Sequence, residues 1–313
     1  MPKTCYVEKT FSPAHQVVIE KANGIIEDYA NQGFDLTLRQ LYYQFVAADL
    51  IPNQEREYKR LGGIVNDARL AGLIDWDAIS DRTRSLRSNS HWESPADIVE
   101  TCARQFQIDK WEDQEKRVEV WIEKDALVGI LEATCEPMDV PYFSCRGYSS
   151  QSEMWRGAMR LVEHIKAGQG VVVLHLGDHD PSGVDMSRDI EDRLRLFIAH
   201  HVGWERALDG FLFTRIALTM DQIEEYEPPP NPAKVTDSRF EAYQELHGDE
   251  SWELDSMSPT TLSALIRSKV MEHRDEDLWN EAEGKQEAHR EELTAVASGW
   301  DRVREFIQAG GSG

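Results

Sequence analysis

The chain has 313 residues, of which 41% are hydrophobic and 29% are charged, as in folded proteins of one or two domains. Its formal net charge of -23 excludes binding to nucleic acid through an overall basic surface, because Lys and Arg supply affinity for phosphate. The charge is uneven. Residues 36–90 contain eight Lys or Arg against seven Asp or Glu, whereas residues 241–313 contain seven against seventeen. We therefore expect contacts with phosphate in the first third of the chain.

Features of a membrane or secreted protein are missing from the sequence. No apolar run is long enough to span a bilayer, and the first residues lack the apolar segment of a secretory signal. The four cysteines are widely spaced, with no pair at the spacing of a metal knuckle. We expect free thiols in a reducing compartment and a cytoplasmic protein without membrane contact.

The first domain is expected over residues 1–95. Helical periodicity predicts helices over residues 13–31, 38–48 and 55–72, and an alternating segment over residues 73–79 predicts a small β-ribbon. Three helices and a basic ribbon are the outline of a winged helix-turn-helix domain, whose third helix and wing contact double-stranded DNA. Three-helix modules also serve as protein adaptors, so the outline alone leaves both functions open.

The basic residues of the third helix and the ribbon are the candidate DNA contacts of this domain. These residues are Arg56, Lys59, Arg60, Arg69, Arg82 and Arg84. Arg146, later in the chain, is a further candidate contact with DNA.

The second predicted helix, which Thr37 caps, carries adjacent tyrosines on different faces. Positions i, i+3, i+4 and i+7 form its apolar stripe, which consists of Leu38, Leu41, Tyr42 and Phe45. Arg39 and Tyr43 lie four residues apart on a neighbouring face. We therefore expect Tyr42 to be packed in the core and Tyr43 to present its hydroxyl beside a guanidinium.

A second domain is expected over residues 117–227, after a polar, charged connection over residues 96–116. In it, short β-branched runs that predict strands alternate with helical periodicity. The strands are expected over residues 118–122, 141–145, 171–176 and 211–218. This alternation predicts an α/β fold with a parallel sheet and helices on both faces. Ligands of such sheets bind outside the carboxyl ends of the strands.

Charged residues follow three of these predicted strands. Glu123 follows the first, Arg146 the second, and Asp178 and Asp180 the third. Two carboxylates two residues apart on an extended backbone point to the same side and can share a hard divalent cation. Taken alone, the Asp-x-Asp-Pro-x-Gly stretch is equally typical of a polar turn. The carboxylate from another strand favours a metal site.

The remainder, residues 228–313, is expected to be a Pro-rich linker followed by an acidic helical extension. Within it, Glu253 and Asp255 are interpreted as the capped start of a helix.

Three motifs together resemble the A subunit of type IIB DNA topoisomerases (topoisomerase VI) and the related meiotic double-strand-break transesterases. Residues 37–43 (Thr-Leu-Arg-Gln-Leu-Tyr-Tyr) resemble the nucleophile motif of the winged-helix domain. Residues 120–126 (Val-Trp-Ile-Glu-Lys-Asp-Ala) and 177–183 (Gly-Asp-His-Asp-Pro-Ser-Gly) resemble two motifs of the Toprim fold. The sequence departs from the family at Gln40, where the family has an acidic residue. In its size and in having no ATPase motif, the chain resembles small stand-alone A-like proteins of phages and mobile elements.

The resemblance implies a winged-helix domain followed by a Toprim domain in a DNA-cleaving enzyme. Tyr43 would attack a phosphodiester and remain attached to a 5′ phosphate, with Arg39 beside it. Glu123, Asp178 and Asp180 would hold Mg²⁺. A homodimer is implied, in which the tyrosine of one protomer works with the metal site of the other, and topoisomerase VI also uses a separate ATPase subunit.

Two alternatives remain at this stage. In a Toprim nuclease, water would attack the phosphodiester and Tyr43 would be structural. The other alternative is a catalytically silent DNA-binding or regulatory protein.

Overall fold

The computed structural model describes residues 3–34, 36–79, 89–147 and 149–310. It divides into two compact units, one comprising Met1–Thr83 with Val118–Glu272 and the other Arg84–Arg117 with His273–Gly313. Within the described ranges, none of the helices combines the length and apolar character needed to cross a bilayer.

Three helices form the N-terminal part of the first unit, as expected. They are α1 (Pro13–Ala30), α2 (Leu38–Ala47) and α3 (Glu55–Leu70). Buried apolar residues from all three helices form one core, which includes Ile19, Ala22, Leu41, Phe45, Leu61 and Ile64. The start of α2 is fixed by a capping box, because Thr37 Oγ1 accepts from Gln40 N (3.2 Å) and Gln40 Oε1 accepts from Thr37 N (2.8 Å). The glutamine that departs from the family motif thus closes the first turn of this helix.

The β-ribbon expected over residues 73–79 does not form there. These residues make turns, and Ile79 makes one isolated bridge to Leu36. The Arg69 guanidinium lies 4.7 Å from the ring centre of Trp76 and donates to its carbonyl group, while Asp75 Oδ1 accepts from Asp77 N (2.9 Å). These contacts hold the segment in a turn. Arg82 and Arg84, expected in the ribbon, lie outside the described residues.

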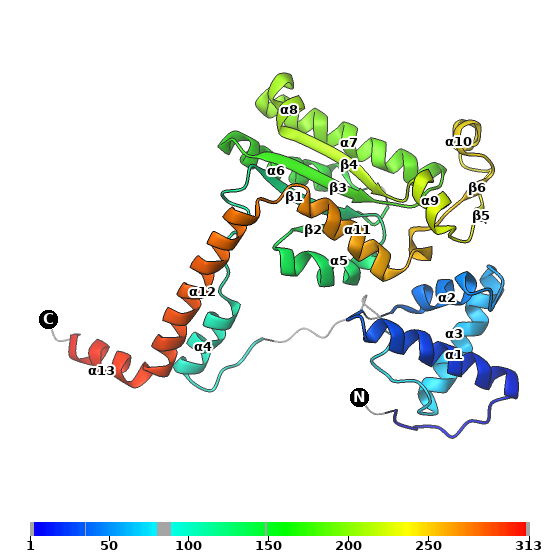
Figure 1. Ribbon diagram of the computed structural model, residues 1–313, viewed down its shortest axis with the longest axis horizontal. Coiled ribbons are helices and arrows are strands. Elements are labelled where there is room, and N and C mark those ends of the chain that lie inside the picture. Colours follow the sequence, from blue (N-terminus) through cyan, green and yellow to red (C-terminus); the bar gives the residue numbers. More distant parts are fainter. Residues whose placement is uncertain (1–2, 35, 80–88, 148, 311–313) are drawn as a thin grey trace. The chain divides into compact units, whose positions relative to one another are not determined.

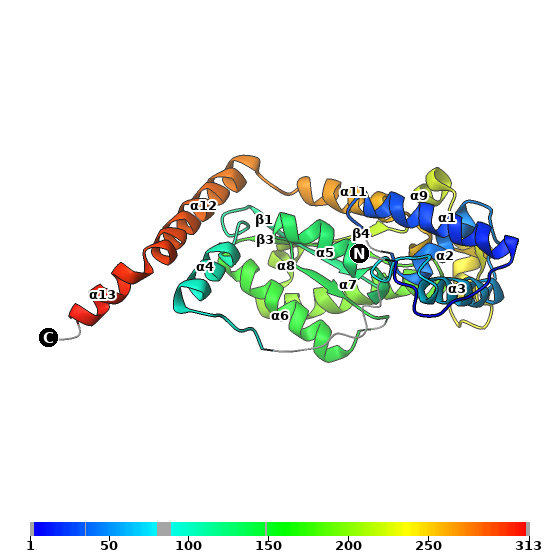
Figure 2. The same cartoon turned by 90° about the horizontal axis from the view of Figure 1, so that it is seen from below.

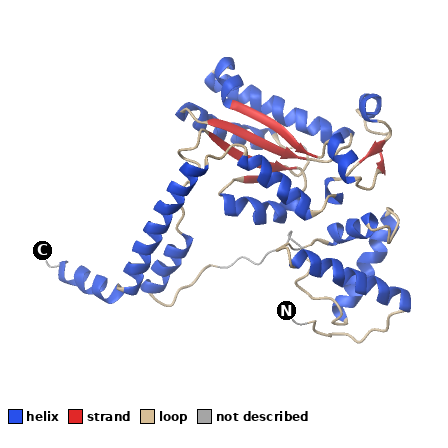
Figure 3. Ribbon diagram, in the orientation of Figure 1, coloured by secondary structure: helices blue, strands red, loops and turns tan. Residues whose placement is uncertain are grey.

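A four-stranded sheet is the centre of the first unit (Figure 3). Its strands are β1 (Lys116–Ile122), β2 (Tyr142–Ser144), β3 (Gly170–Leu176) and β4 (Phe211–Ala217), in the order β2-β1-β3-β4. Strand β1 pairs with β2 in parallel, and β3 pairs with β4 in parallel. The predicted α/β fold is confirmed at this level.

Helices cover both faces of the sheet (Figure 1). On one face lie α6 (Gln151–Ala167), α7 (Pro181–Val202) and α8 (Trp204–Gly210), and on the other lie α5 (Val128–Cys135) and α11 (Pro259–Met271). The short helices of this unit are η1 (Asp125–Leu127), η2 (Glu136–Met138), α9 (Met220–Tyr226), α10 (Phe240–His247) and η3 (Leu254–Ser256). Apolar residues that alternate along the strands pack against α6 and α7, among them Trp121, Val171, Val173 and Phe211.

The segment expected as a Pro-rich linker contains a short strand. Strand β5 (Asn231–Pro232) pairs antiparallel with β6 (Glu250–Ser251). Directly after β6, Trp252 and His179 exchange two backbone hydrogen bonds of 2.8 and 2.9 Å. This bridge places η3 beside the carboxyl end of β3.

The second unit is helical. Helix α4 (Pro95–Gln105) lies alongside α12 (Glu276–Ser298), and α13 (Trp300–Gly310) follows α12 (Figures 1 and 2). Gln114 makes reciprocal hydrogen bonds of 3.0 and 2.7 Å with the backbone of Asp275, just before α12. Residues expected to form a connection thus pack against the acidic C-terminal extension.

Candidate functional site

The carboxyl end of β3 leads into a tight turn that positions both aspartates of the Asp-x-Asp motif. Asp180 is the N-cap of α7, and its Oδ1 accepts from Gly183 N (2.6 Å). A Cβ atom at position 183 would lie 2.3 Å from the carbonyl oxygen of Asp178, so the turn requires glycine there. Asp178 is buried at the end of the strand. In this motif, Asp180 therefore caps α7 and Asp178 places a buried carboxylate at the end of β3.

Glu123 follows β1 and lies beside this turn, as the strand-end argument predicts. Its Oε2 accepts from Asp178 N (3.0 Å). Burial and the neighbouring charge of Asp178 raise the pKa of Glu123 to about 7. Burial also raises the pKa of Asp178, to about 6, although Lys124 opposes the shift. Both carboxyl groups therefore ionise less readily in the folded protein than they would in water.

Lys124 is a member of the site that the sequence analysis did not identify. Its Nζ lies 2.9 Å from Asp178 Oδ1 and 3.2 Å from Asp255 Oδ1, and it also pairs with Glu253. Burial disfavours the ammonium charge, but these carboxylates outweigh burial and raise the pKa of Lys124. The Glu-Lys-Asp sequence after β1 contained the residue, but its partners come from distant segments.

Arg39 joins α2 to the same cluster through two carboxylates. Its Nη2 lies 2.6 Å from Glu253 Oε2, and its Nε lies 2.7 Å from Asp255 Oδ2. Asp255 has no exposed surface, and within the described structure neither of its oxygens accepts a hydrogen bond of good geometry. Oδ2 nevertheless lies within ion-pair distance of Arg39, and Oδ1 within ion-pair distance of Lys124. The attraction between Asp255 and these two cations is therefore mainly Coulombic.

The side chain of Glu253 does not cap a helix, contrary to the interpretation from sequence. The first turn of η3 receives no hydrogen bond from it, and the carboxylate pairs with Arg39 and Lys124 instead.

Tyr43 lies beside Arg39, as the helical spacing predicts, but it is only 4% exposed. The guanidinium carbon of Arg39 is 5.8 Å from the centre of the Tyr43 ring. Burial and the charge of Glu253 raise the pKa of Tyr43, and the opposing effect of Arg39 and Lys124 is smaller. Forming a phenolate is therefore more costly in this conformation than in water.

Tyr42 is packed as expected, but its hydroxyl is also used. It accepts from Gln54 N (2.7 Å) and donates to Asn53 Oδ1 (3.0 Å), and Asn53 Nδ2 in turn donates to Asn231 Oδ1 (2.7 Å). This chain of hydrogen bonds runs from α2 to β5. Both tyrosines are buried in the core that α2 forms with α1 and α3, and η3 also packs on α2.

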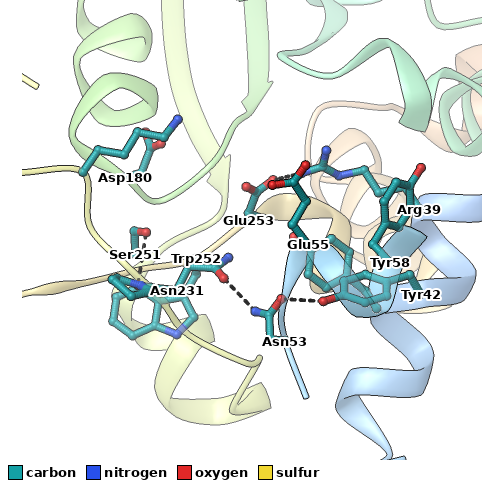
Figure 4. Close-up of a pocket in the computed structure, with 13 residues that line it drawn as sticks. Arg39, Tyr42, Asn53, Glu55, Tyr58, Asp180, Asn231, Ser251, Trp252 and Glu253 are labelled. Carbon is teal, nitrogen blue, oxygen red and sulfur yellow. Dashed lines mark hydrogen bonds and ion pairs between the residues drawn. The ribbon is translucent and has the colours of Figure 1, made fainter. Parts of the chain in front are cut away.

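A cavity of about 340 Å³ lies between α2 and the turn after β3 (Figure 4). Asp180 lines it on one side, and Arg39, Tyr42 and Tyr58 line it on the other. The complete lining consists of these residues with Tyr43, Asn53, Glu55, Asn231, Pro232, Lys234, Ser251, Trp252 and Glu253. The predicted nucleophile and one predicted metal ligand thus face the same cavity.

Arg215, in β4, holds the backbone of the Asp-x-Asp turn in place. Its guanidinium donates to the carbonyl oxygens of Gly177 (3.1 Å), Asp178 (2.6 Å) and Gly183 (2.9 Å). Burial lowers its pKa, against the attraction of Glu123 and other carboxylates. Sequence analysis missed this residue, although an arginine within an apolar strand is the signal that could have identified it.

The candidate DNA contacts differ in exposure and in the groups that they contact. Arg56, Lys59 and Arg60 are exposed on α3, where they form ion pairs with Glu55 or Glu57. Arg69 is turned toward Trp76, as described above. Arg146 is exposed and pairs with Asp125 (3.0 Å).

The chemistry of the predicted metal ligands suits Mg²⁺, since Glu123, Asp178 and Asp180 offer carboxylate oxygens only. Among the described residues, however, no three His, Cys, Asp or Glu side chains are grouped so that they could hold a metal ion. Instead, Lys124 supplies the cation that contacts Asp178.

Comparison of the chain with protein-family models, curated proteins and solved structures found no match.

Proposed function

We propose that this protein cuts double-stranded DNA by transesterification, with Tyr43 as the nucleophile. The observation that carries the proposal is that Tyr43 and Asp180 line one cavity, with Arg39 and Lys124 at the carboxylates beside it. Two parts of the chain that resemble the nucleophile and Toprim motifs of the topoisomerase VI family therefore meet at one place. In this proposal, residues 1–95 act as a winged-helix domain and residues 117–227 as a Toprim domain.

The proposed step exchanges one phosphodiester for another. The Tyr43 phenol oxygen forms a bond to phosphorus, and the bond from phosphorus to the 3′ oxygen of the preceding nucleotide breaks. The phenol gives up its proton to solvent and the leaving 3′ oxygen takes one up, so no oxidant or cosubstrate is consumed. The product is a 5′-phosphotyrosyl bond that can be resealed.

Because the pKa of Tyr43 is raised, the proposed step needs a nearby positive charge that favours the phenolate. A phosphate that replaces Glu253 as the partner of Arg39 would leave the guanidinium beside both the phenol and the phosphate. Arg39 would then favour the phenolate and orient the target, whereas in the present conformation its charge is neutralised by carboxylates.

Glu123, Asp178 and Asp180 would hold Mg²⁺ only after a rearrangement in which Lys124 leaves Asp178, because the described conformation does not group these side chains around a common point. The raised pKa values of Glu123 and Asp178 fit this role, because a cation would favour their ionised forms. When bound, the ion would stabilise negative charge that develops on the phosphate and on the leaving oxygen.

Further parts of the proposal follow from the resemblance. A double-strand cut needs two active sites and hence a homodimer. The exposed Arg56, Lys59, Arg60 and Arg146 would contact phosphates in exchange for their present carboxylate partners. The protein would act in the cytoplasm, and a separate ATPase subunit would be its partner if strand passage follows cleavage.

Hydrolysis of DNA by activated water is the second candidate. The burial and raised pKa of Tyr43 favour it, because a water molecule in the cavity needs no phenolate.

The two candidates differ in their product. Incubation of the protein with supercoiled DNA and Mg²⁺, followed by detergent and gel analysis, yields protein-linked DNA in the first case and protein-free nicked or linear DNA in the second. The Tyr43→Phe protein distinguishes them again, because only the nuclease stays active.

A further inference from the structure

We infer that the cavity beside α2 binds one nucleotide, with the base at Tyr58 and Trp252 and the phosphate at Lys234. Binding there requires neither a metal ion nor attack by Tyr43, so it goes beyond the proposed function. The ligand is a nucleoside monophosphate, either free in solution or as an unpaired residue of a DNA strand.

The cavity has the size and the walls of a small-molecule site. Its volume, about 340 Å³, lies at the lower end of the range of such sites and leaves no room for duplex DNA. Helix α2 and the start of α3 supply one wall, and β5, β6 and the residue after β6 supply another (Figure 4). A ligand of the size of one nucleotide can therefore be held between segments that are distant in sequence.

Aromatic side chains from both walls line the cavity. Tyr42 and Tyr58 lie on one side, with ring centres 5.4 Å apart and planes at 81°. Trp252 lies on the other side, and its ring packs edge-on against His179 with 6.0 Å between the ring centres. Unpaired bases stack on rings of this kind. Since neighbouring rings already hold these side chains, a base that binds to them restricts little additional motion.

Two hydrogen-bond donors of the lining have no partner in the part of the chain that the structure describes. Asn231 Oδ1 accepts from Asn53 Nδ2 (2.7 Å), which fixes the amide and leaves Asn231 Nδ2 unpaired. Trp252 is only 7% exposed, and its indole N–H is unpaired but not sealed from solvent. Donors in buried side chains normally have a partner. The carbonyl oxygens and ring nitrogens of a nucleobase are suitable acceptors for both.

Lys234 supplies the positive charge for a phosphate. Its side chain is exposed, and its ammonium group makes no ion pair within the described ranges. Arg39, the other cation of the lining, is neutralised by Glu253 and Asp255. The charge available to an anion in this conformation is therefore that of Lys234.

The carboxylates of the lining are each compensated by another group. Glu253 pairs with Lys124. Glu55 pairs with Lys59 at 2.7 Å. Asp180 caps the N-terminus of α7, where the helix dipole favours a negative charge. These groups therefore oppose the binding of an anion less than three uncompensated carboxylates would.

A base of DNA can enter the cavity only after it leaves the double helix. Extrusion of a paired base costs stacking and pairing energy, and the cost is smallest for a base that is already unpaired. A strand with an unpaired nucleotide should therefore bind more tightly than a fully paired duplex, whereas a free nucleotide binds without this cost.

Calorimetric titration of the full chain without Mg²⁺ tests the site. The probes are dTMP, thymidine and inorganic phosphate, because thymine offers two carbonyl acceptors and thymidine lacks the charge. We expect one dTMP to bind per chain, thymidine to bind more weakly, and phosphate not to compete at equal concentration. If dTMP binds no more tightly than inorganic phosphate, the site takes anions only and the nucleotide assignment is overturned.

Two variants separate the base from the phosphate. Lys234→Gln removes an exposed charge and should weaken dTMP about tenfold, with a change of less than about twofold for thymidine. Asn231→Asp keeps the acceptor for Asn53 but removes the unpaired donor, and should weaken the uncharged thymidine about fivefold. The control is Lys166→Gln, which removes an exposed lysine of α6 outside the cavity and should change neither affinity. Equal affinities in all four proteins would place the ligand elsewhere and contradict the assignment.

A second titration distinguishes the two sources of the nucleotide. A duplex with one unpaired thymidine is compared with the same duplex fully paired, again without Mg²⁺. A preference of about tenfold for the unpaired site, lost in Asn231→Asp, indicates a nucleotide of a DNA strand. Saturable binding of dTMP without that preference indicates a free nucleotide. Equal affinity for both duplexes, together with no binding of dTMP at millimolar concentration, overturns the inference.

The titrations do not depend on cleavage. Wild-type protein that forms no covalent adduct with DNA defeats the proposed function, whereas the affinities for dTMP and thymidine still decide whether the cavity is a nucleotide site.

Discussion

Nε of Arg39 lies 2.7 Å from Oδ2 of Asp255, a carboxylate with no exposed surface that comes from the opposite end of the first unit's sequence. Arg39 is about half exposed, so one side of the pair faces solvent and the other is buried. The pair joins the helix that carries Tyr43 to the cluster that contains Asp178. Its strength therefore bears on both folding and function.

Replacement of Arg39 by Ala should lower the free energy of unfolding by about 2 kcal/mol, less than for a fully buried pair because Arg39 is partly solvated and Lys124 still contacts Asp255. Asp255→Asn in the same chain should recover part of the loss, since the buried carboxylate that has lost one of its two cations is then replaced by a neutral side chain. Urea unfolding measures both. Arg56→Ala, which removes an exposed arginine from α3, serves as the control and should have little effect. Equal losses for Arg39→Ala and Arg56→Ala would show that the buried pair contributes nothing.

The adjacent tyrosines should respond differently to loss of a hydroxyl. Tyr42→Phe removes the acceptor of the Gln54 N–H group and should destabilise the protein by about 1–3 kcal/mol. Tyr43→Phe should stay within about 0.5 kcal/mol of wild type, because the described residues make no hydrogen bond to that hydroxyl. Thermal and urea unfolding of the two variants, side by side, provide the comparison. The reverse order of stability would mean that the hydroxyl contacts are wrongly assigned.

Structural features that depend on residues close together in the chain could be predicted from the sequence, and features that depend on contacts between distant segments could not. Local patterns predicted the three N-terminal helices and the four parallel strands, because periodicity and capping act within a few residues. The strand-end rule also placed Glu123 beside Asp178. The prediction of a β-ribbon over residues 73–79 was wrong, because Arg69 packs on Trp76 and the segment forms turns. Alternation alone could not reveal that contact.

The remaining site residues depend on tertiary contacts. Lys124, Arg215 and Asp255 acquire their roles from partners in other elements, and no spacing within the chain indicates those partners. Helical spacing predicted that Tyr43 lies beside Arg39, and a guanidinium alone would lower the pKa of the phenol. It rises because burial and Glu253 outweigh the arginine, and both effects require knowledge of how η3 packs on α2.

The free energy of unfolding should depend on pH through Glu123. Its pKa in the folded protein, about 7, lies above the ordinary value of 4.5, so the folded state binds more protons than the unfolded state between these values. Without Mg²⁺, stability should therefore fall as pH rises from about 4.5 to 7, by about 3 kcal/mol at most, and Asp178 adds a change of the same sign at lower pH.

Urea unfolding across this pH range, in wild type and in Glu123→Gln, measures that dependence. The variant should show a flatter profile, because its side chain does not titrate. A wild-type protein that gains stability over the same range would contradict the assigned direction.

Mg²⁺ should stabilise the protein, because a ligand that binds the folded state alone raises the free energy of unfolding, by about 2.7 kcal/mol at one hundred times its Kd. Asp178→Asn should reduce the gain. The matched control is Asp192→Asn, which removes an exposed carboxylate of α7 that pairs with Arg188 and should leave the gain unchanged. Differential scanning fluorimetry with increasing Mg²⁺ gives the three responses. Identical shifts in all three proteins would place any bound ion elsewhere.

The central claim, that Tyr43 is the nucleophile of a DNA-cleaving enzyme, is tested most directly by isolating the covalent product. End-labelled DNA is incubated with protein and Mg²⁺, the reaction is stopped with detergent, and nuclease-trimmed peptides are analysed by mass spectrometry. The account predicts a nucleotide attached to Tyr43, and no adduct from Tyr43→Phe although that variant folds. Cleaved DNA without attached protein, produced equally by wild type and Tyr43→Phe, would contradict it.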